Sequence, residues 1–434
     1  MRDLNLPPRL PPASGRPAGS ARIDAVDTPA DSSDVRRRNL ALVLRHIAAH
    51  GPCARTELAA ATGLVSASIT ALAAELIGSG LVREAGLASS GSRGRPRKLL
   101  ELRAGRVQTV AVEVMPDRLA GAVCDLSGTV TWRGERVLAA PGDPRPVAEQ
   151  IAGLVQEALE ATATPGRTQV HTARLVLAVP GAVIEDDLIA DSILLGWRRI
   201  DLAALVRAAL PAGSCPVSVV NEANMAAFAE YHALASRTGT APRAFAYLRV
   251  GPGIGGGLVV DGQIQTGGHG MAGEFGHIPV AFDGPACKCG DHGCLVTYLG
   301  LEALMRAAGL DPDLHDQDPE RARADFDRRL RAGDPGPARA LEAGARALAT
   351  ALTAVSRVAD PEQVVLGGHL AAWSDWLVPT VLRHFAGRRA ITPTDEPVLS
   401  TELLGRHATI VGALRHGCET VFNDPASVPS LTRP

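Results

Sequence analysis

Three of the seven cysteines in this 434-residue chain crowd into one short segment, and no other sequence feature constrains the local fold as strongly. Cys287, Cys289 and Cys294 follow His277 in a polar, glycine-rich loop. Three thiolates and one imidazole satisfy tetrahedral zinc and leave no position open, so the predicted metal is structural. We favour His277 over the competing ligand His292. The alternative, free core thiols, is disfavoured by the polarity of the loop.

The rest of the sequence narrows the class of protein. The other cysteines are scattered among apolar or loop residues, unlike a disulfide framework. No apolar run approaches the roughly 20 residues of a membrane span, and the N-terminus lacks the basic patch and hydrophobic block of a secretory signal. We therefore expect a cytoplasmic protein of two or three globular units, with no membrane partner.

Charge is distributed unevenly along the chain. The formal net charge is −2, yet residues 35–106 hold twelve Arg or Lys against four Glu. That segment has a local net charge of +8, which leaves −10 for the remainder. A basic segment joined to an acidic body is typical of a DNA-binding module attached to a separate sensing or catalytic module.

The basic segment has the pattern of a winged helix-turn-helix, which we place at residues 35–104. Residues 1–34 precede it and are rich in Pro, Ala, Ser and Gly, so they are expected to be a disordered tail. The expected elements are a helix from Val35 to a stop at Gly51-Pro52, helices over Arg55–Thr62 and Ser66–Ile77, and wing strands at Leu81–Glu84 and Leu99-Leu100.

The third expected helix presents small or polar side chains to the major groove, and none of them makes a bidentate base contact. The wing is better equipped, because Arg95 between Gly94 and Pro96 suits a narrow minor groove and its basic neighbours can hold phosphates. The alternative is a helical interaction domain with a solvated basic loop. The residues expected to contact double-stranded DNA are Arg55, Ser66, Ser68, Thr70, Arg93, Arg95, Arg97 and Lys98.

Beyond residue 106, short β-rich runs alternate with Ala/Leu-rich helical patterns, as an α/β fold requires. Thr109–Val114 is an expected strand early in this body, and Leu258–Val260 is another after a glycine run. Asp311–Gly336 is dense in Asp, Arg and Pro and is expected to be an exposed insertion.

Several motifs together resemble one known family. The central signature joins a Gly-His pair to the Cys-x-Cys-Gly-x-x-Gly-Cys loop. The supporting motifs are V-R-R-R-N-L-A-L-V-L-R, the G-R-P wing, V-P-G-A-V at 179–183, L-G-W at 195–197, N-E-A-N at 221–224, G-P-G-I-G-G-G at 251–257 and G-M-A-G-E-F-G-H at 270–277. The chain is thus similar, from Val35 onward, to the ROK group of repressors and sugar kinases.

This resemblance implies a two-lobed, actin-like (ribonuclease H-like) sugar-kinase fold over residues 105–434. The first lobe would comprise 105–222 with a C-terminal helix at 406–421, and the second lobe 223–405. It also implies zinc near a sugar cleft and assembly as a homodimer or homotetramer. An oligomer fits physically, because two helix-turn-helix units can read a palindromic operator.

The resemblance also locates the kinase motifs, and this chain departs from each. Glu222 replaces the Asp that serves as base and carries its carboxylate one methylene further out. In the first phosphate loop, Glu113–Asp117, Met115 removes a glycine and Asp117 places negative charge where phosphate should sit. Pro252 replaces a Thr in the second loop and deletes an N–H donor. We therefore expect no kinase activity.

Four residues match the positions with which the family binds sugar hydroxyls: Asn221, Glu222, Glu274 and the zinc-linked His277. Val296, however, stands where the family usually has Glu, which forfeits hydroxyl contacts. The alternative for Asn221 is a turn cap, and for Glu274 a structural carboxylate.

We expect a DNA-binding regulator, a repressor whose operator binding is relieved by a sugar-like effector that it does not phosphorylate. Two alternatives stay open. One is an active ATP-dependent sugar kinase with an appended DNA module. The other is a ligand-independent regulator that keeps the body only as a dimerisation scaffold.

Overall fold

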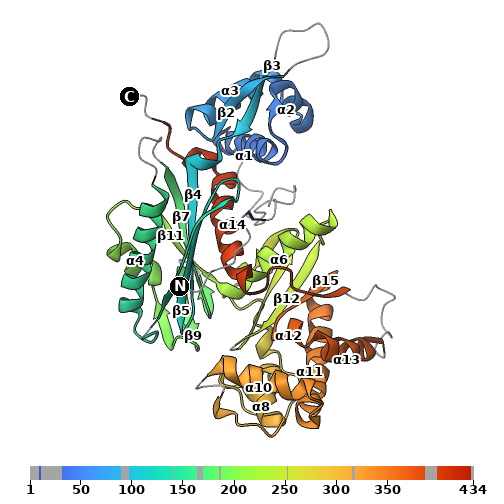
Figure 1. The fold of residues 1–434 in the computed structure, drawn as a ribbon. Helices are drawn as coiled ribbons and strands as arrows, with labels where there is room; N and C mark the ends of the chain where they lie inside the picture. The colour runs from blue at the N-terminus through green and yellow to red at the C-terminus, as the bar shows by residue number, and fades with distance from the viewer. Residues whose placement is uncertain are drawn as a thin grey trace. The chain divides into compact units, whose positions relative to one another are not determined.

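The computed structural model describes residues 9–10, 32–88, 97–138, 140–163, 170–184, 187–251, 253–314, 318–386 and 398–431. These residues form two compact units, which Figure 1 colours by position in the chain. The first unit extends to Glu222 and resumes at Ile410, and the second comprises Ala223–Thr409. The N-terminal module and the C-terminal helix therefore belong to the same unit.

The N-terminal module is a winged helix-turn-helix. Gly63 adopts a left-handed conformation with φ of 72° and ends the second helix, whose axis makes an angle of 116° with that of the third. That angle is typical of the motif. The elements are α1 (Ser32–His50), β1 (Cys53–Ala54), α2 (Arg55–Thr62), α3 (Ser66–Gly78), β2 (Val82–Ala88) and β3 (Arg97–Leu102), with the strands in the order β1-β3-β2.

No single helix in the described ranges has the length and apolar character needed to cross a membrane. The bent pair α2 and α3 passes that test jointly, by length and composition only.

The first unit continues with a five-stranded sheet in the order β11-β7-β4-β5-β6. Alternate residues of β4 face opposite sides, so Val110 and Val112 pack under α4 while Thr109 faces α14. Figure 1 shows α4 and α14 on the two sides of the sheet. The elements are β4 (Val107–Val114), β5 (Arg118–Asp125), β6 (Val130–Val137), α4 (Pro144–Thr162), β7 (His171–Val179), β8 (Ala182–Ile184), β9 (Leu188–Ser192), β10 (Trp197–Ile200), α5 (Leu202–Ala209) and β11 (Val217–Asn221).

The C-terminal helix α14 (Ala408–Asn423) packs closely on this sheet. A Cβ atom at Gly417 would lie 2.1 Å from the Cγ2 atom of Thr109, so only glycine allows this approach. One residue further on, the Cys418 sulfur lies 3.6 Å from that of Cys124 in β5, and both side chains are buried. The end of the chain thus completes a layer that begins some 300 residues earlier.

The same helix also holds the N-terminal module. Arg45 of α1 pairs with Glu419 at 2.5 Å and donates a second hydrogen bond to Asn423 at 2.7 Å. Its guanidinium also lies 5.4 Å from the centre of the Phe422 ring, within range of a cation–π interaction. Both side chains of the ion pair are largely buried, 17% and 13% exposed. Few water molecules therefore compete for this contact.

The residues after α14 bind the module at a second place. Arg106 donates one hydrogen bond to the carbonyl of Ser79, which follows α3, and another to the carbonyl of Pro429. The backbone N–H of Leu431 donates to the carbonyl of Gly78 at the end of α3. Helix α3 is therefore anchored to the C-terminal segment.

The second unit repeats the strand order of the first sheet, as β14-β13-β12-β15-β16. Helix α6 covers one face, where Tyr231 meets Phe245 edge to face, and a cluster of helices around α11 buries the other face. The elements are α6 (Glu222–Thr238), β12 (Ala244–Val250), β13 (Ile254–Val260), β14 (Gln263–Gln265), α7 (Val296–Leu299), α8 (Leu301–Ala307), α10 (Pro319–Arg331), α11 (Pro335–Ala359), β15 (Gln363–Gly368), α12 (His369–Ala372), α13 (Ser374–Ala386) and β16 (Val398–Thr401).

Helix α6 carries a buried carboxylate that fixes the loop before α14. Glu230 is 1% exposed and accepts hydrogen bonds from the backbone N–H groups of Leu403 and Leu404, at 2.8 and 2.7 Å. Burial raises the pKa of Glu230 to about 7, although these two hydrogen bonds oppose the shift.

Four expectations need correction, and three of them concern single elements. Arg9 and Leu10, inside the expected disordered tail, lie against Gly128 and Thr129, because Leu10 is an apolar side chain that this contact buries. The first helix begins at Ser32 instead of Val35. The expected strand at Leu258–Val260 starts four residues earlier, because the preceding glycine run also pairs with β12, and Gly256 leaves room for the Phe275 ring.

The expected insertion at Asp311–Gly336 is also wrong in part. It contains α10, whose Ala322, Phe326 and Leu330 are buried in the core of the second unit. These residues follow one another at intervals of four and form one apolar stripe, while the charged residues occupy the rest of the helix surface.

We predict that Arg45→Ala lowers the free energy of unfolding of the first unit by about 3–5 kcal/mol, because it leaves Glu419 buried without its partner. The matched control is Arg83→Ala, which breaks an ion pair whose arginine is 64% exposed and should cost at most about 1 kcal/mol. Denaturant unfolding of both variants checks the difference, and equal losses would contradict the assigned role of Arg45.

Candidate metal centre and DNA-binding surface

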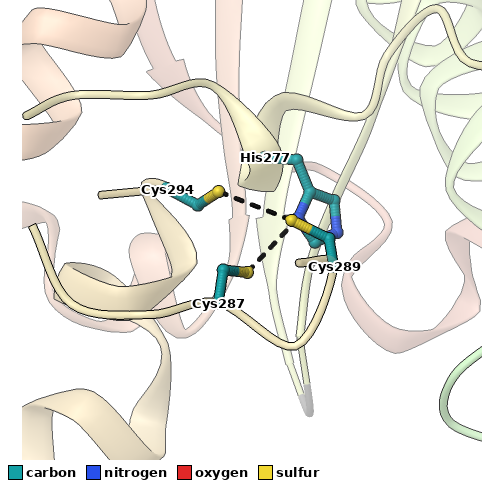
Figure 2. A group of neighbouring side chains, drawn as sticks. All are labelled: His277, Cys287, Cys289 and Cys294. Carbon is teal, nitrogen blue, oxygen red and sulfur yellow. Dashed lines mark hydrogen bonds between the residues drawn. The ribbon is translucent and has the colours of Figure 1, made fainter. Parts of the chain in front are cut away.

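The four side chains singled out as metal ligands lie together in the second unit (Figure 2). One ligand atom from each of His277, Cys287, Cys289 and Cys294 lies within 4.8 Å of all the others. The sulfurs of Cys289 and Cys294 are 3.7 Å apart, and the Cys287 sulfur is 3.6 Å from Nδ1 of His277. His292 is exposed and stands outside this group.

These spacings agree with the coordination shell of zinc. Two sulfurs that each lie about 2.3 Å from one tetrahedral zinc are about 3.8 Å apart, and a bound sulfur and imidazole nitrogen are about 3.6 Å apart. The two distances within the cluster match these values within 0.1 Å. The donor set therefore fits a closed, four-coordinate zinc site with no position for a catalytic water.

The backbone of the loop forms this cluster through tight turns. Cys287 donates its N–H to the carbonyl of Asp291, and Gly290 donates to the carbonyl of Cys287. Gly293 has φ of 69°, and a Cβ atom there would lie 1.9 Å from the carbonyl oxygen of Ala281. Glycine is thus required at position 293 to bring Cys294 toward the other ligands.

The four residues expected to bind an effector belong to both units. Asn221 ends β11 and donates its amide to the carbonyl of Gly181 at 2.9 Å, and Glu222 begins α6. Both are in the first unit. Glu274 and His277 lie in the second unit at the short 3-10 helix Phe275–His277, and burial raises the pKa of Glu274.

Val296 begins α7 and packs against the core of the second unit. An apolar contact thus occupies the position at which the resemblance implied a hydroxyl-binding carboxylate. The sequence already showed valine at this position, and the structure shows that its side chain lies against the core.

The loop in the place of the first phosphate loop is a tight turn between β4 and β5. The N–H of Met115 donates to the carbonyl of Arg118 at 2.9 Å, and the N–H of Arg118 donates back at 3.3 Å. The Arg118 guanidinium lies 3.5–3.8 Å from carboxylates of Glu113, Asp117 and Glu135. The two N–H donors and the guanidinium charge are therefore already paired with groups of the turn and its two strands and with Glu135 of β6. Pro252 of the second loop lies outside the described residues.

The DNA-binding candidates that are described gather on one module. Ser66 and Thr70 are exposed on α3, and Ser68 is partly buried. Arg55 begins α2, while Arg97 and Lys98 begin β3, where both are exposed. Arg93 and Arg95 lie outside the described residues.

One contact of this surface was not anticipated from the sequence. Glu84 of β2 pairs with Lys98 at 2.6 Å and with Arg55 at 3.4 Å. No local spacing indicates it, because the partners come from three separate elements.

A family model described as "ROK family" matches residues 109–416. The chain is 26% identical over 338 residues to a xylose repressor of Bacillus subtilis, covering 78% of this chain and 83% of that protein. It is 31% identical over 286 residues to an N-acetylmannosamine kinase of Citrobacter koseri, covering 64% and 88%. A crystal structure of a ROK family transcriptional regulator, a homologue of the E. coli MLC protein, superposes with a TM-score of 0.72 at 23% identity and covers 90% and 97%.

We predict that the purified protein holds about one zinc per chain and that Cys287→Ser lowers both the zinc content and the melting temperature. The control is Cys215→Ser, which removes a partly buried thiol outside the cluster and should leave the zinc content unchanged. Elemental analysis of both variants gives the answer. A full zinc content in Cys287→Ser would contradict the ligand assignment.

Proposed function

Because this chain belongs to the ROK family, we propose that it is a DNA-binding transcriptional regulator, a repressor, whose body binds a sugar or sugar derivative without phosphorylating it. The observation that carries the proposal is the winged helix-turn-helix, whose α3 exposes Ser66 and Thr70 and whose β3 begins with two exposed basic residues. Small polar side chains on this helix allow close approach to base edges. We further propose that His277 and the three cysteines bind a structural zinc in the second unit.

The similarity to xylose repressors supports this role. The fold of the ROK family transcriptional regulator also covers 90% of this chain, whereas the fold of a ROK hexokinase from Thermus thermophilus covers 71%. We infer that the effector is a monosaccharide or a derivative of one, as the names of these relatives indicate. We further propose a homodimer or homotetramer, since a symmetric pair of helix-turn-helix modules matches a palindromic operator.

The turn at residues 115–118 supports the absence of phosphorylation. The N–H groups of Met115 and Arg118 bond to carbonyls within the turn, and the guanidinium of Arg118 lies near three carboxylates. A phosphate would have to displace these contacts and approach negative charge, which is costly. Asn221, Glu222, Glu274 and His277 are the proposed effector-binding residues, and Val296 favours a sugar that needs fewer hydroxyl contacts.

A kinase remains the competing function, because Glu222 keeps a carboxylate at the base position and several relatives are kinases. We predict no ADP release above background when the protein is incubated with ATP and a panel of hexoses, pentoses and N-acetylhexosamines. Glu222→Gln is the control, since it removes the carboxylate that would serve as the catalytic base. Sugar-dependent ADP release that disappears in Glu222→Gln would overturn the proposal.

A thermal-shift screen with the same sugars tests effector binding, because a ligand that binds only the folded state raises the melting temperature. A protein that no sugar stabilises, but that still binds DNA tightly, would instead be a ligand-independent regulator.

A further inference from the structure

The basic surface at the base of the wing contains one carboxylate between two of its cations. Glu84 of β2 accepts a hydrogen bond from Nζ of Lys98 at 2.6 Å through one oxygen and faces the Arg55 guanidinium at 3.4 Å through the other. Close by, Arg97 donates to the hydroxyl of Thr56, the second residue of α2, at 3.4 Å. The contacts therefore join the start of α2 to the base of the wing.

Solvent reaches this trio of side chains. Lys98 is 60% exposed, Glu84 36% and Arg55 30%. Ion pairs at such exposure contribute little to stability, so the cations can exchange Glu84 for another anion. The hydrogen bond from Lys98 lowers the pKa of Glu84, which keeps the carboxylate charged at neutral pH.

The trio has a net charge of +1, although it contains two of the cations that the sequence assigns to DNA. Binding of a protein to duplex DNA releases about 0.9 counterions for each phosphate that it neutralises. If the Glu84 carboxylate stays beside the two cations, about one fewer positive charge is available to neutralise phosphates, so about one fewer counterion is released. It also repels the phosphates that approach the cations.

We propose that Glu84 is an internal counter-charge that competes with DNA phosphates for Arg55 and Lys98 and so limits the sequence-independent DNA affinity of this protein. The inference rests on the proposed DNA-binding function and adds a residue that tunes it. Phosphate contacts carry no sequence information, so the restraint acts on binding to random DNA as well as to an operator. It lowers the affinity for both kinds of DNA and leaves their ratio, which sets the specificity, unchanged.

The same hairpin supplies a matched control. Arg83 and Glu101 lie directly opposite each other in β2 and β3 and pair at 2.6 Å. Because Arg83 precedes Glu84 in the strand, this second pair lies on the other face of the hairpin. Glu101→Gln therefore makes the same change in net charge on the same two strands, away from Arg55 and Lys98.

The test measures the affinity of the full chain for a duplex of random sequence by fluorescence anisotropy, over salt concentrations from about 50 to 200 mM. Glu84→Gln should bind several-fold more tightly at the lowest salt, and the slope of log K against log salt should steepen by about 1. Glu84→Asp keeps the charge and should retain a slope close to that of the unmodified protein. Glu101→Gln should also leave the slope nearly unchanged.

Equal slopes for Glu84→Gln and the unmodified protein, or an equal steepening in Glu101→Gln, would overturn the inference while leaving DNA binding intact. Failure of all four proteins to bind DNA even at low salt would instead remove the proposed function, and the inference with it. Melting temperatures of the variants verify that each one is folded.

Discussion

The ion pair between Arg45 and Glu419 fixes the N-terminal winged helix-turn-helix module to the rest of the first unit. Glu419 lies on α14, and two residues earlier Gly417 lets that helix approach Thr109 in the central strand of the sheet. The hydrogen bonds of Arg106 and Leu431 add a second attachment at the end of α3. The module therefore has contacts that hold its orientation, where a flexible linker would leave that orientation free.

This arrangement determines how the parts of a regulator can cooperate. The first unit contains the helix-turn-helix, a sheet that ends at Asn221 and Glu222, and the helix that joins them. Packed elements of one unit thus connect the end of β11 to α1. The second unit contributes the candidate metal centre, whose closed donor set suits a structural ion.

The sequence anticipated features that have local signatures. The turn at Gly63, the bounds of α2 and the meeting of His277 with the three cysteines all follow from residue type and spacing. The contact between Arg45 and Glu419 joins residues 374 positions apart, so no local pattern reports it. The stripe of Ala322, Phe326 and Leu330 had a readable helical period, but the high charge density around it favoured an exposed segment instead.

Selection of bound sequences from a random pool of DNA duplexes tests the central claim most directly. The full, zinc-containing protein is used, and the affinity for the enriched sequence is compared with that for random DNA at physiological salt. A DNA-binding regulator should enrich a palindromic sequence and bind it at least about a thousand-fold more tightly than random DNA. No enrichment, or equal affinity for both duplexes, would contradict the account.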